Sequence, residues 1–204
     1  MFFPLRPIPE GKKKMKQFIF TSLKDPRAAR LRAALIEEYD NRYGNFYDEE
    51  GAKAELDRYP AEDFTPPRGN FLLLIDGEET IGGGAFKFYD ETTAELKRIW
   101  IDNGYRRQGL AALILEQLEL QARRQGYSRL YLTTGFRQPE AVNLYLKNGY
   151  TNLFDLNGDW EAYRHLPFEK DISDKRPENN NERDNQLRSF SPVKAQSALS
   201  LKSL

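Results

Sequence analysis

The sequence predicts a single α/β domain with its elements in the order βαα-βββ-αβαββ. Helix-like segments and strand-like apolar runs alternate through the second half of the chain, which is typical of folds that combine a sheet with helices. The length of 204 residues fits one domain and is enough for one well-buried core. We expect this domain at 15–168, between two segments of different composition.

Both ends of the chain are predicted to lie outside the domain. Residues 1–14 are rich in Pro and Lys and are expected to form a flexible extension, so that Met15 competes with Met1 as the native start. Residues 169–204 contain a single aromatic residue, Phe190, among Asn, Ser, Lys and Glu. Such a segment cannot bury enough apolar surface to offset its ordering entropy, so a disordered C-terminal tail is expected.

The first part of the domain is predicted to hold one strand and two helices. The strand covers 15–23. An Asp-Pro pair at 25–26 supplies an N-cap and a first-turn proline for a helix that runs to about residue 41. A shorter helix is expected at 49–58, because a proline at position 60 ends it.

Three strands are predicted next, at 71–76, 81–89 and 93–101. The first two are joined by a Gly-Glu-Glu turn at 77–79, which indicates a β-hairpin.

The last part of the domain alternates helices with strands. A helix at 110–124 carries apolar residues at helical spacing and is followed by Gly126 as its C′ residue. A second helix at 139–147 begins at a proline and ends before an Asn-Gly pair. Further strands are expected at 130–134, 150–154 and 160–168.

The loop at 106–111, with the sequence Arg-Arg-Gln-Gly-Leu-Ala, connects a predicted strand to a predicted helix. The first N–H groups of a helix have no partner within the helix, and the helix dipole favours negative charge there. Gly109 and Ala111 are small, so the main chain can approach a ligand closely. The loop is therefore predicted to bind phosphate groups.

Two other glycine patterns do not fit nucleotide-binding loops. The spacing from Gly104 to Gly109 is that of a Walker A loop, but Leu110 and Ala111 stand where Lys and Ser/Thr would be needed. The three glycines at 82–84 cannot complete a G-x-G-x-x-G motif and are not followed by a helix pattern. Both observations argue against a nucleoside triphosphate or a dinucleotide.

Composition excludes several classes of chemistry. Lys+Arg and Asp+Glu both number 31, so no overall field attracts nucleic acid or an anionic membrane. The chain has no cysteine and only one histidine, His165, which we expect at the surface or in packing. We expect no metal site. No apolar run is long enough to span a bilayer and no signal peptide is recognisable, so a cytoplasmic protein is expected.

The R-x-x-G-x-A pattern of the loop resembles the pyrophosphate-binding loop of the GNAT superfamily of CoA-dependent N-acyltransferases. Three further segments resemble the same superfamily, and the resemblance extends over roughly 15–168. These segments are the strand at 94–101, the strand at 130–134 and the A-x-x-L-Y-x-K-x-G-Y stretch within 138–150. One departure is Gln138, since many members carry Asn three residues before the alanine.

The resemblance implies a fold and an activity. The fold would be a mixed, mostly antiparallel sheet of about seven strands, splayed at its centre and flanked by about four helices. The activity would be transfer of an acetyl group from acetyl-CoA to a primary amine within a ternary complex, with no metal. The same pattern would suit a non-catalytic acyl-CoA-binding or sensor module, or a transferase that uses a larger acyl-CoA.

Two side chains are candidate catalytic residues by this resemblance. Glu95 lies eleven residues before Arg106, where the histone-acetylating branch has its glutamate, and would be the general base. Its alternative role is an ion pair with Lys97 or Arg98. Tyr145 would be the general acid that protonates the leaving thiolate, and its alternative role is packing with a satisfied hydroxyl.

The resemblance also assigns residues to CoA. Arg106 and Arg107 would cover its phosphates with side-chain charge, while the backbone amides of Gln108, Gly109, Leu110 and Ala111 bind them. Main-chain N–H groups of Ile99, Trp100 and Ile101 would stabilise the oxyanion. Asn143 would reach the pantetheine arm, or else be an exposed polar residue of its helix. Simple alternation along the strand places Glu95 on the face of Ile99 and Ile101, which a β-bulge would reverse.

The acceptor is expected to meet the loop that joins the two N-terminal helices. Tyr43, Phe46 and Tyr47 are the candidate substrate-binding residues, since aromatic rings interleaved with acids bind amines by cation–π and ion-pair contacts. Packing of a helix end on the core would explain the same residues. The acceptor is a small-molecule or peptide amine that the sequence does not identify further, and the protein is expected to be a monomer or a homodimer.

Overall fold

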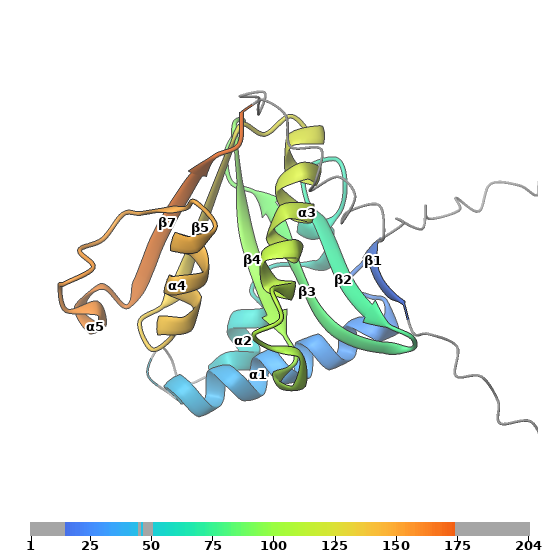
Figure 1. Cartoon of the computed structure of the whole chain (residues 1–204), viewed down its shortest axis with the longest axis horizontal. Coiled ribbons are helices and arrows are strands. Elements are labelled where there is room, and N and C mark those ends of the chain that lie inside the picture. Colours follow the sequence, from blue (N-terminus) through green and yellow to red (C-terminus); the bar gives the residue numbers. More distant parts are fainter. Residues whose placement is uncertain (1–14, 45, 47–50, 174–204) are drawn as a thin grey trace, which may run out of the picture.

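The computed structural model describes residues 15–44, 46 and 51–173, and Figure 1 shows how their elements are arranged. The expected extension at 1–14, the segment 174–204 of the expected tail, and Tyr47 lie outside the described residues.

One sheet of seven strands forms the centre of the described structure, in the order β1-β2-β3-β4-β5-β7-β6. Every neighbouring pair is antiparallel except β4 and β5, which are parallel. The expected mixed, mostly antiparallel sheet is therefore confirmed. The strands are β1 Lys16–Thr21, β2 Asn70–Asp76, β3 Glu79–Phe88, β4 Thr93–Ile101, β5 Arg129–Gly135, β6 Thr151–Asn152 and β7 His165–Asp171.

Helices cover both faces of this sheet. One face carries α3, which packs on β2, β3 and β4, and the other carries α1, which packs on β3 and β4. Asp25 caps the 3-10 turn that leads into α1, because its side chain accepts a hydrogen bond from the Arg27 N–H. The helices are α1 Ala29–Tyr43, α2 Gly51–Asp57, α3 Leu110–Arg124, α4 Pro139–Lys147 and the single turn α5 Trp160–Tyr163.

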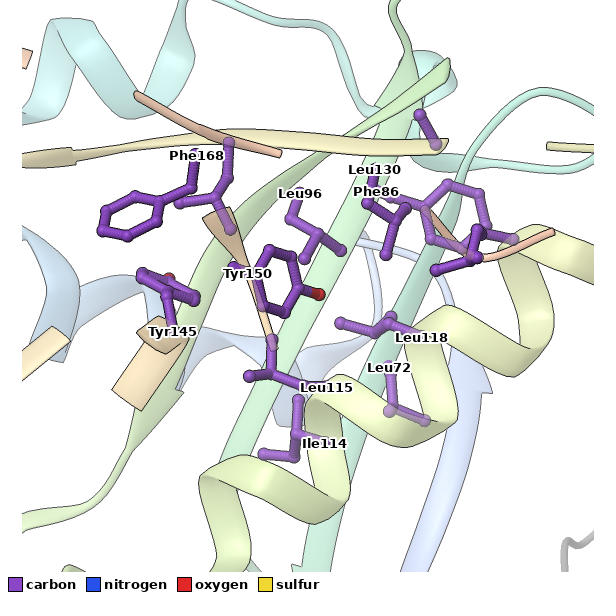
Figure 2. Packing of buried hydrophobic residues seen from close by; sticks show 14 of the residues in the cluster. Leu72, Phe86, Leu96, Ile114, Leu115, Leu118, Leu130, Tyr145, Tyr150 and Phe168 are labelled. Atoms are coloured by element: carbon purple, nitrogen blue, oxygen red, sulfur yellow. The ribbon is translucent and has the colours of Figure 1, made fainter. Parts of the chain in front are cut away.

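Each face of the sheet has its own hydrophobic core. The larger core lies under α3 and α4 and contains Phe86, Leu118 and Phe168, each fully buried. Figure 2 shows this core from close by, with Tyr145 and Tyr150 among its aliphatic side chains. The smaller core lies under α1 and α2. Side chains thus fill the space on both faces of the sheet, so an opening can form only where two neighbouring strands separate.

That opening begins where β4 and β5 part. Their parallel pairing covers only Thr93–Glu95 of β4 against Arg129–Tyr131 of β5. Beyond Glu95 the two strands diverge, as Figure 1 shows. β5 keeps a full partner on its other side, because it pairs with β7 over seven residues. The edge of β4 that faces β5 is therefore open from Leu96 onward.

A β-bulge interrupts β4 just after this point. Arg98 has a left-handed φ of 60°, which is uncommon outside glycine, and the register with β3 shifts between Gly83 and Ala85. A bulge places two residues of one strand opposite one residue of its partner, so later side chains change face.

The bulge corrects the face assigned to Glu95. Leu96 and Ile99 both contribute to the core under α3 although three positions separate them, whereas Trp100 joins the core under α1. Glu95, adjacent to Leu96, therefore lies on the face opposite to Ile99. The simple alternation that grouped Glu95 with Ile99 and Ile101 is wrong, because the extra residue at the bulge inverts the pattern.

The expected strand at 160–168 is wrong in its first half. Asp159 caps a helical turn by accepting a hydrogen bond from the Glu161 N–H, and this turn is α5. Arg164, with a φ of 60°, then redirects the chain into β7. β7 continues to Asp171 and Ile172 is 2% exposed, so the ordered domain extends past the expected boundary at residue 168.

Three consecutive glycines in β3 let the layers approach one another. A methyl group on Gly82 or Gly84 would press on Ile114 or Leu118 of α3, respectively. A methyl group on Gly83 would lie 2.5 Å from Leu31 Cδ1 of α1 and 2.7 Å from the Leu72 carbonyl oxygen. The three glycines at 82–84, which do not fit a nucleotide-binding loop, thus allow the helices on both faces to pack closely on β3.

We predict that Gly83→Ala lowers the free energy of unfolding by about 1–3 kcal/mol, because the added carbon meets a backbone oxygen that cannot move aside. Urea denaturation of the two proteins measures this loss. The matched control is Gly104→Ala, where the nearest atom would be Asp102 Oδ1 at 3.4 Å. The control should change stability by less than about 0.5 kcal/mol. Equal stability of Gly83→Ala and the wild type would contradict the close approach.

Candidate active site

A cavity of about 450 Å³ lies at the divergence of β4 and β5. Its volume suits a small molecule. The walls come from α1, from the segment around the end of α2, from the β4 bulge, from the end of β5, and from α4 with the start of β7. Lining residues include Glu38, Tyr39, Tyr43, Arg58, Tyr59, Leu96, Lys97, Arg98, Ile99, Thr134, Gly135, Gln138, Ala141, Tyr145, Arg164 and His165.

The loop before α3 has the geometry of an anion cradle. Gly109 is the N-cap of α3 with a left-handed φ of 76°, and a Cβ built on it would meet no atom within 4 Å. Arg107 has a left-handed φ of 61°. The first N–H groups of α3 have no acceptor within the helix, and no acidic side chain lies in its first turn. The space beside Gly109 is thus open for a phosphate group.

The two arginines of this loop lie in different environments. The Arg106 guanidinium pairs with Glu38 of α1 at 2.9 Å, and its Nε donates to the Ile101 carbonyl at 3.2 Å. The side chain that was expected to cover phosphate is therefore bound to the protein itself. Arg107 and Gln108 are exposed beside Gly109. Of the two arginines, Arg107 is the better placed to meet an anion at the cradle.

Tyr145 of α4 lies in the cavity wall and is 6% exposed. Its ring packs on Tyr150 and Phe168, with ring centroids 5.6 and 5.4 Å away. Figure 2 shows Tyr145 beside Phe168 in the core. Burial raises the pKa of Tyr145 well above its usual value, with a smaller contribution from Tyr39. The hydroxyl therefore stays protonated around neutral pH and can act as a proton donor.

Glu95 lies between two lysines of the sheet. Its carboxylate is 2.7 Å from Lys97 Nζ and 3.1 Å from Lys87 Nζ. Of these three residues only Lys97 lines the cavity, and the lining of β4 begins at Leu96, one residue after Glu95. Glu95 thus forms the ion pair that was its alternative role, and it lies at the edge of the cavity rather than in its wall.

The backbone candidates lie along the open edge of β4. Ile99 lines the cavity, while Trp100 and Ile101 are buried in the cores on opposite faces. Their N–H groups belong to the stretch of β4 beyond its pairing with β5. Asn143 is exposed on α4 and is not part of the cavity lining. The first turn of α3 contains buried Leu110 and partly buried Ala111.

The aromatic residues expected at the acceptor lie near the end of β5. Tyr43 lines the cavity, and its hydroxyl accepts a hydrogen bond from the Arg137 N–H at 3.2 Å. Burial raises the pKa of Tyr43. A methyl group on Gly135 would overlap the Tyr43 hydroxyl, so this glycine allows the contact. Phe46 stacks near Phe136, with a centroid separation of 5.0 Å.

Several cavity residues were absent from the sequence prediction. Tyr59, Arg58 and Arg164 lie far from the recognisable motifs in the chain, so no spacing rule could group them. Gln138 could be found, since it is the departure from the family pattern. Its side-chain oxygen accepts from the Thr134 hydroxyl at 2.7 Å and from the Gly135 N–H at 3.1 Å. It therefore holds the end of β5 to the start of α4.

The described residues hold neither a metal-binding cluster nor a membrane-spanning helix. No group of three or more His, Cys, Asp or Glu residues in the described ranges could hold a metal ion. Within those same ranges, no helix is long and apolar enough to cross a bilayer.

Comparison with known proteins places this geometry in a family. Residues 32–150 match the family described as "Acetyltransferase (GNAT) family". Human N-acetyltransferase 8 is 35% identical over 89 residues, covering 41% of this chain and 39% of that protein. The uncharacterized N-acetyltransferase YedL of Escherichia coli is 34% identical over 88 residues, covering 42% of this chain and 55% of that protein. The chain thus spans about half the length of these curated relatives or less.

A solved structure shares the fold. PaiA N-acetyltransferase from Thermoplasma acidophilum, determined in complex with coenzyme A, has a TM-score of 0.57 at 19% identity. The comparison covers 76% of this chain and 99% of that one. The expected sheet, its splay and its helices are therefore those of the fold that the sequence resembles. Because the family match covers more than half of its residues, the chain belongs to the GNAT family of acetyltransferases.

Proposed function

We propose that the protein transfers an acetyl group from acetyl-CoA to a primary amine. The observation that carries this proposal is the cavity at the β4–β5 divergence, which has in its wall a buried Tyr145 that stays protonated because burial raises its pKa. An anion cradle begins α3, the helix that packs on the same strand β4. Acetyl-CoA has a part that suits each feature: its pyrophosphate suits the cradle, its pantetheine amides suit the open strand edge, and its sulfur takes a proton when the thiol leaves.

The residues present fit CoA. The open space at Gly109, the first N–H groups of α3 and the exposed Arg107 would hold its pyrophosphate. The unpaired edge of β4 would bind its pantetheine amides, with Asn143 reaching the arm from α4. When bound, acetyl-CoA supplies the thioester and its thiol leaving group.

The reaction balances with the groups available. The amine nitrogen bonds to the acetyl carbonyl carbon and the carbon–sulfur bond breaks. The ammonium form of the acceptor loses two protons in all, Tyr145 gives one to the sulfur, and solvent returns that proton to Tyr145. The products are the amide, the CoA thiol and one released proton. Bringing the two substrates together can contribute about 7–11 kcal/mol, and proton transfer typically adds about 10²–10⁴-fold.

Glu95 is the proposed general base, acting through a water molecule because its carboxylate lies outside the cavity wall. It shares its face with Lys97, which does line the cavity.

The N–H groups of Ile99 to Ile101 would stabilise the oxyanion. A non-catalytic CoA-binding module would keep the cradle but have no need of Tyr145, and a larger acyl donor would differ only in the volume it fills. We place the enzyme in the cytoplasm.

The first prediction concerns the cradle. CoA at 100 times its dissociation constant should stabilise the wild type by about 2.7 kcal/mol, seen as a raised Tm, and ATP or NAD should do much less. Gly109→Val should lose this shift because the side chain fills the open space. The matched control is Gly126→Val, at the other end of α3, where φ is also positive and no atom lies within 4 Å. A normal CoA shift in Gly109→Val would mean that the cradle is misplaced.

The second prediction concerns the proton donor. Tyr145→Phe should lower kcat by about 10²-fold, because only the hydroxyl is removed, while CoA affinity stays within a few-fold. Thiol release from acetyl-CoA and a thermal-shift titration measure the two quantities. Tyr150→Phe is the matched control, since Tyr150 packs on the same ring and donates to Glu119 at 2.9 Å, away from the cavity. Unchanged turnover in Tyr145→Phe would mean that the hydroxyl is structural, and a collapse of CoA binding would mean that it is a ligand contact.

The third prediction separates a base from an ion pair at Glu95. In Glu95→Gln the reaction would depend on free amine from solution, so kcat/KM should fall at neutral pH and recover as pH approaches the pKa of the acceptor. The wild type should reach its plateau at a lower pH than the variant, because the enzyme itself takes the proton from the ammonium group of the acceptor. Initial rates are measured across pH and corrected for the folded fraction. Parallel profiles would leave Glu95 with a purely structural role.

A further inference from the structure

Basic side chains dominate the charged groups in the cavity wall. Among the described residues that line it, one carries a carboxylate, Glu38. The lining side chains that carry a permanent positive charge are Arg58, Lys97, Arg98 and Arg164.

The single lining carboxylate is already neutralised by the protein. Glu38 pairs with Arg106 at 2.9 Å and with Arg42 at 2.9 Å. The guanidinium groups of Arg42 and Arg106 thus share the Glu38 carboxylate. The pair with Arg106 also links α1 to the loop before α3. Glu38 is poorly placed to attract a second positive charge, because an incoming ammonium would compete with both arginines.

Beside the cavity, a cluster of two ammonium groups and one carboxylate carries an excess of positive charge, and its Lys97 lines the cavity. Glu95 pairs with both Lys87 and Lys97, so one carboxylate serves two ammonium groups. The three side chains are 9%, 14% and 21% exposed, respectively, and charges this far from solvent are weakly screened. Both ammonium groups also lie over the ring of Tyr59, at 4.5 Å for Lys87 and 5.4 Å for Lys97.

Lys97 is the member of this group that a ligand can reach. It lines the cavity, whereas Lys87 does not. Glu95 and Tyr59 hold its ammonium group in place before any ligand arrives, so little side-chain entropy is lost on binding. Tyr145 lines the same cavity, which allows one small molecule to meet both side chains.

We propose that the acceptor amine also carries a carboxylate, as a free amino acid does, and that Lys97 receives this carboxylate. This proposal rests on the proposed acetyl transfer and names the class of its acceptor. A carboxylate completes the pairing that Glu95 alone cannot give to two lysines. Polyamines are disfavoured, because an added ammonium group would approach Lys97, which already shares its carboxylate partner with Lys87.

The test compares acceptors that carry the carboxylate with acceptors that lack it. Thiol release from acetyl-CoA is followed with a panel of free L-amino acids, with the amide of each, and with spermidine. The acids should show kcat/KM values about 10- to 100-fold above those of their amides, the range of a charge-assisted hydrogen bond. Amides or spermidine that match or exceed the acids would overturn the proposal.

Two variants test whether Lys97 makes the distinction. Lys97→Met keeps the length of the side chain and should bring the ratio of acid to amide close to one. Lys87→Met is the matched control, since Lys87 shares Glu95 and Tyr59 but lies outside the lining, and it should keep the wild-type ratio. An equal loss of the ratio in both variants would show that the whole charge cluster is responsible, which overturns the assignment to Lys97.

Failure of the parent proposal gives a different result. If CoA binds but no amine of any charge releases thiol, the acetyl transfer itself is wrong, and the acceptor class falls with it. If neutral amines release thiol as efficiently as the acids, acetyl transfer stands and only the carboxylate is wrong.

Discussion

The early end of pairing between β4 and β5 is the constraint on which the rest of this structure depends. A sheet strand normally satisfies its N–H and C=O groups on both sides, and leaving one side open has a cost unless something else binds there. Here the parallel pairing stops after Glu95, and the bulge at Arg98 follows at once. The open edge therefore coincides with the point at which β4 side chains exchange faces. The cavity, the candidate oxyanion donors and Lys97 all lie along this stretch.

Ion pairs hold the walls around this opening together. Glu38 on α1 binds Arg106 of the cradle loop and Arg42 of its own helix, and Arg42 continues to Glu140 at the start of α4. These ion pairs form one network that joins α1 to the loop before α3 and to the start of α4. Surface ion pairs contribute little individually, but a network that crosses three elements fixes their relative positions. This explains why Arg106 faces the protein and leaves Arg107 to the solvent.

Local signals were sufficient for much of the fold. The bounds of β4, α3 and α4 agree with those predicted from apolar spacing, proline starts and glycine stops, because such elements are decided by neighbouring residues. The bulge at Arg98 left no local trace, since it depends on how β3 packs between two layers. The segment 160–168 combines a capped helical turn with a strand, and the turn buries none of its side chains, so apolar patterning gives no signal for it. The basic cavity wall could not be predicted either, because it gathers residues from distant segments of the chain.

The glycines of β3 allow close packing in one half of the domain, which differs in this respect from the contact between β4 and β5. With no side chains at three successive positions, the strand is in direct contact with α1 on one side and α3 on the other, and no rotamer change can take up a movement between them. The half of the domain built on β1 to β4 is therefore held together by close contacts between layers. The other half, β5 and β7 with α4, joins it in the sheet through only three parallel residue pairs. A change in the width of the cavity would therefore disturb the fewest strand pairs if it occurred between these two halves, and the ion pairs of Glu38 and Arg42, which join α1 to the loop before α3 and to α4, would oppose it.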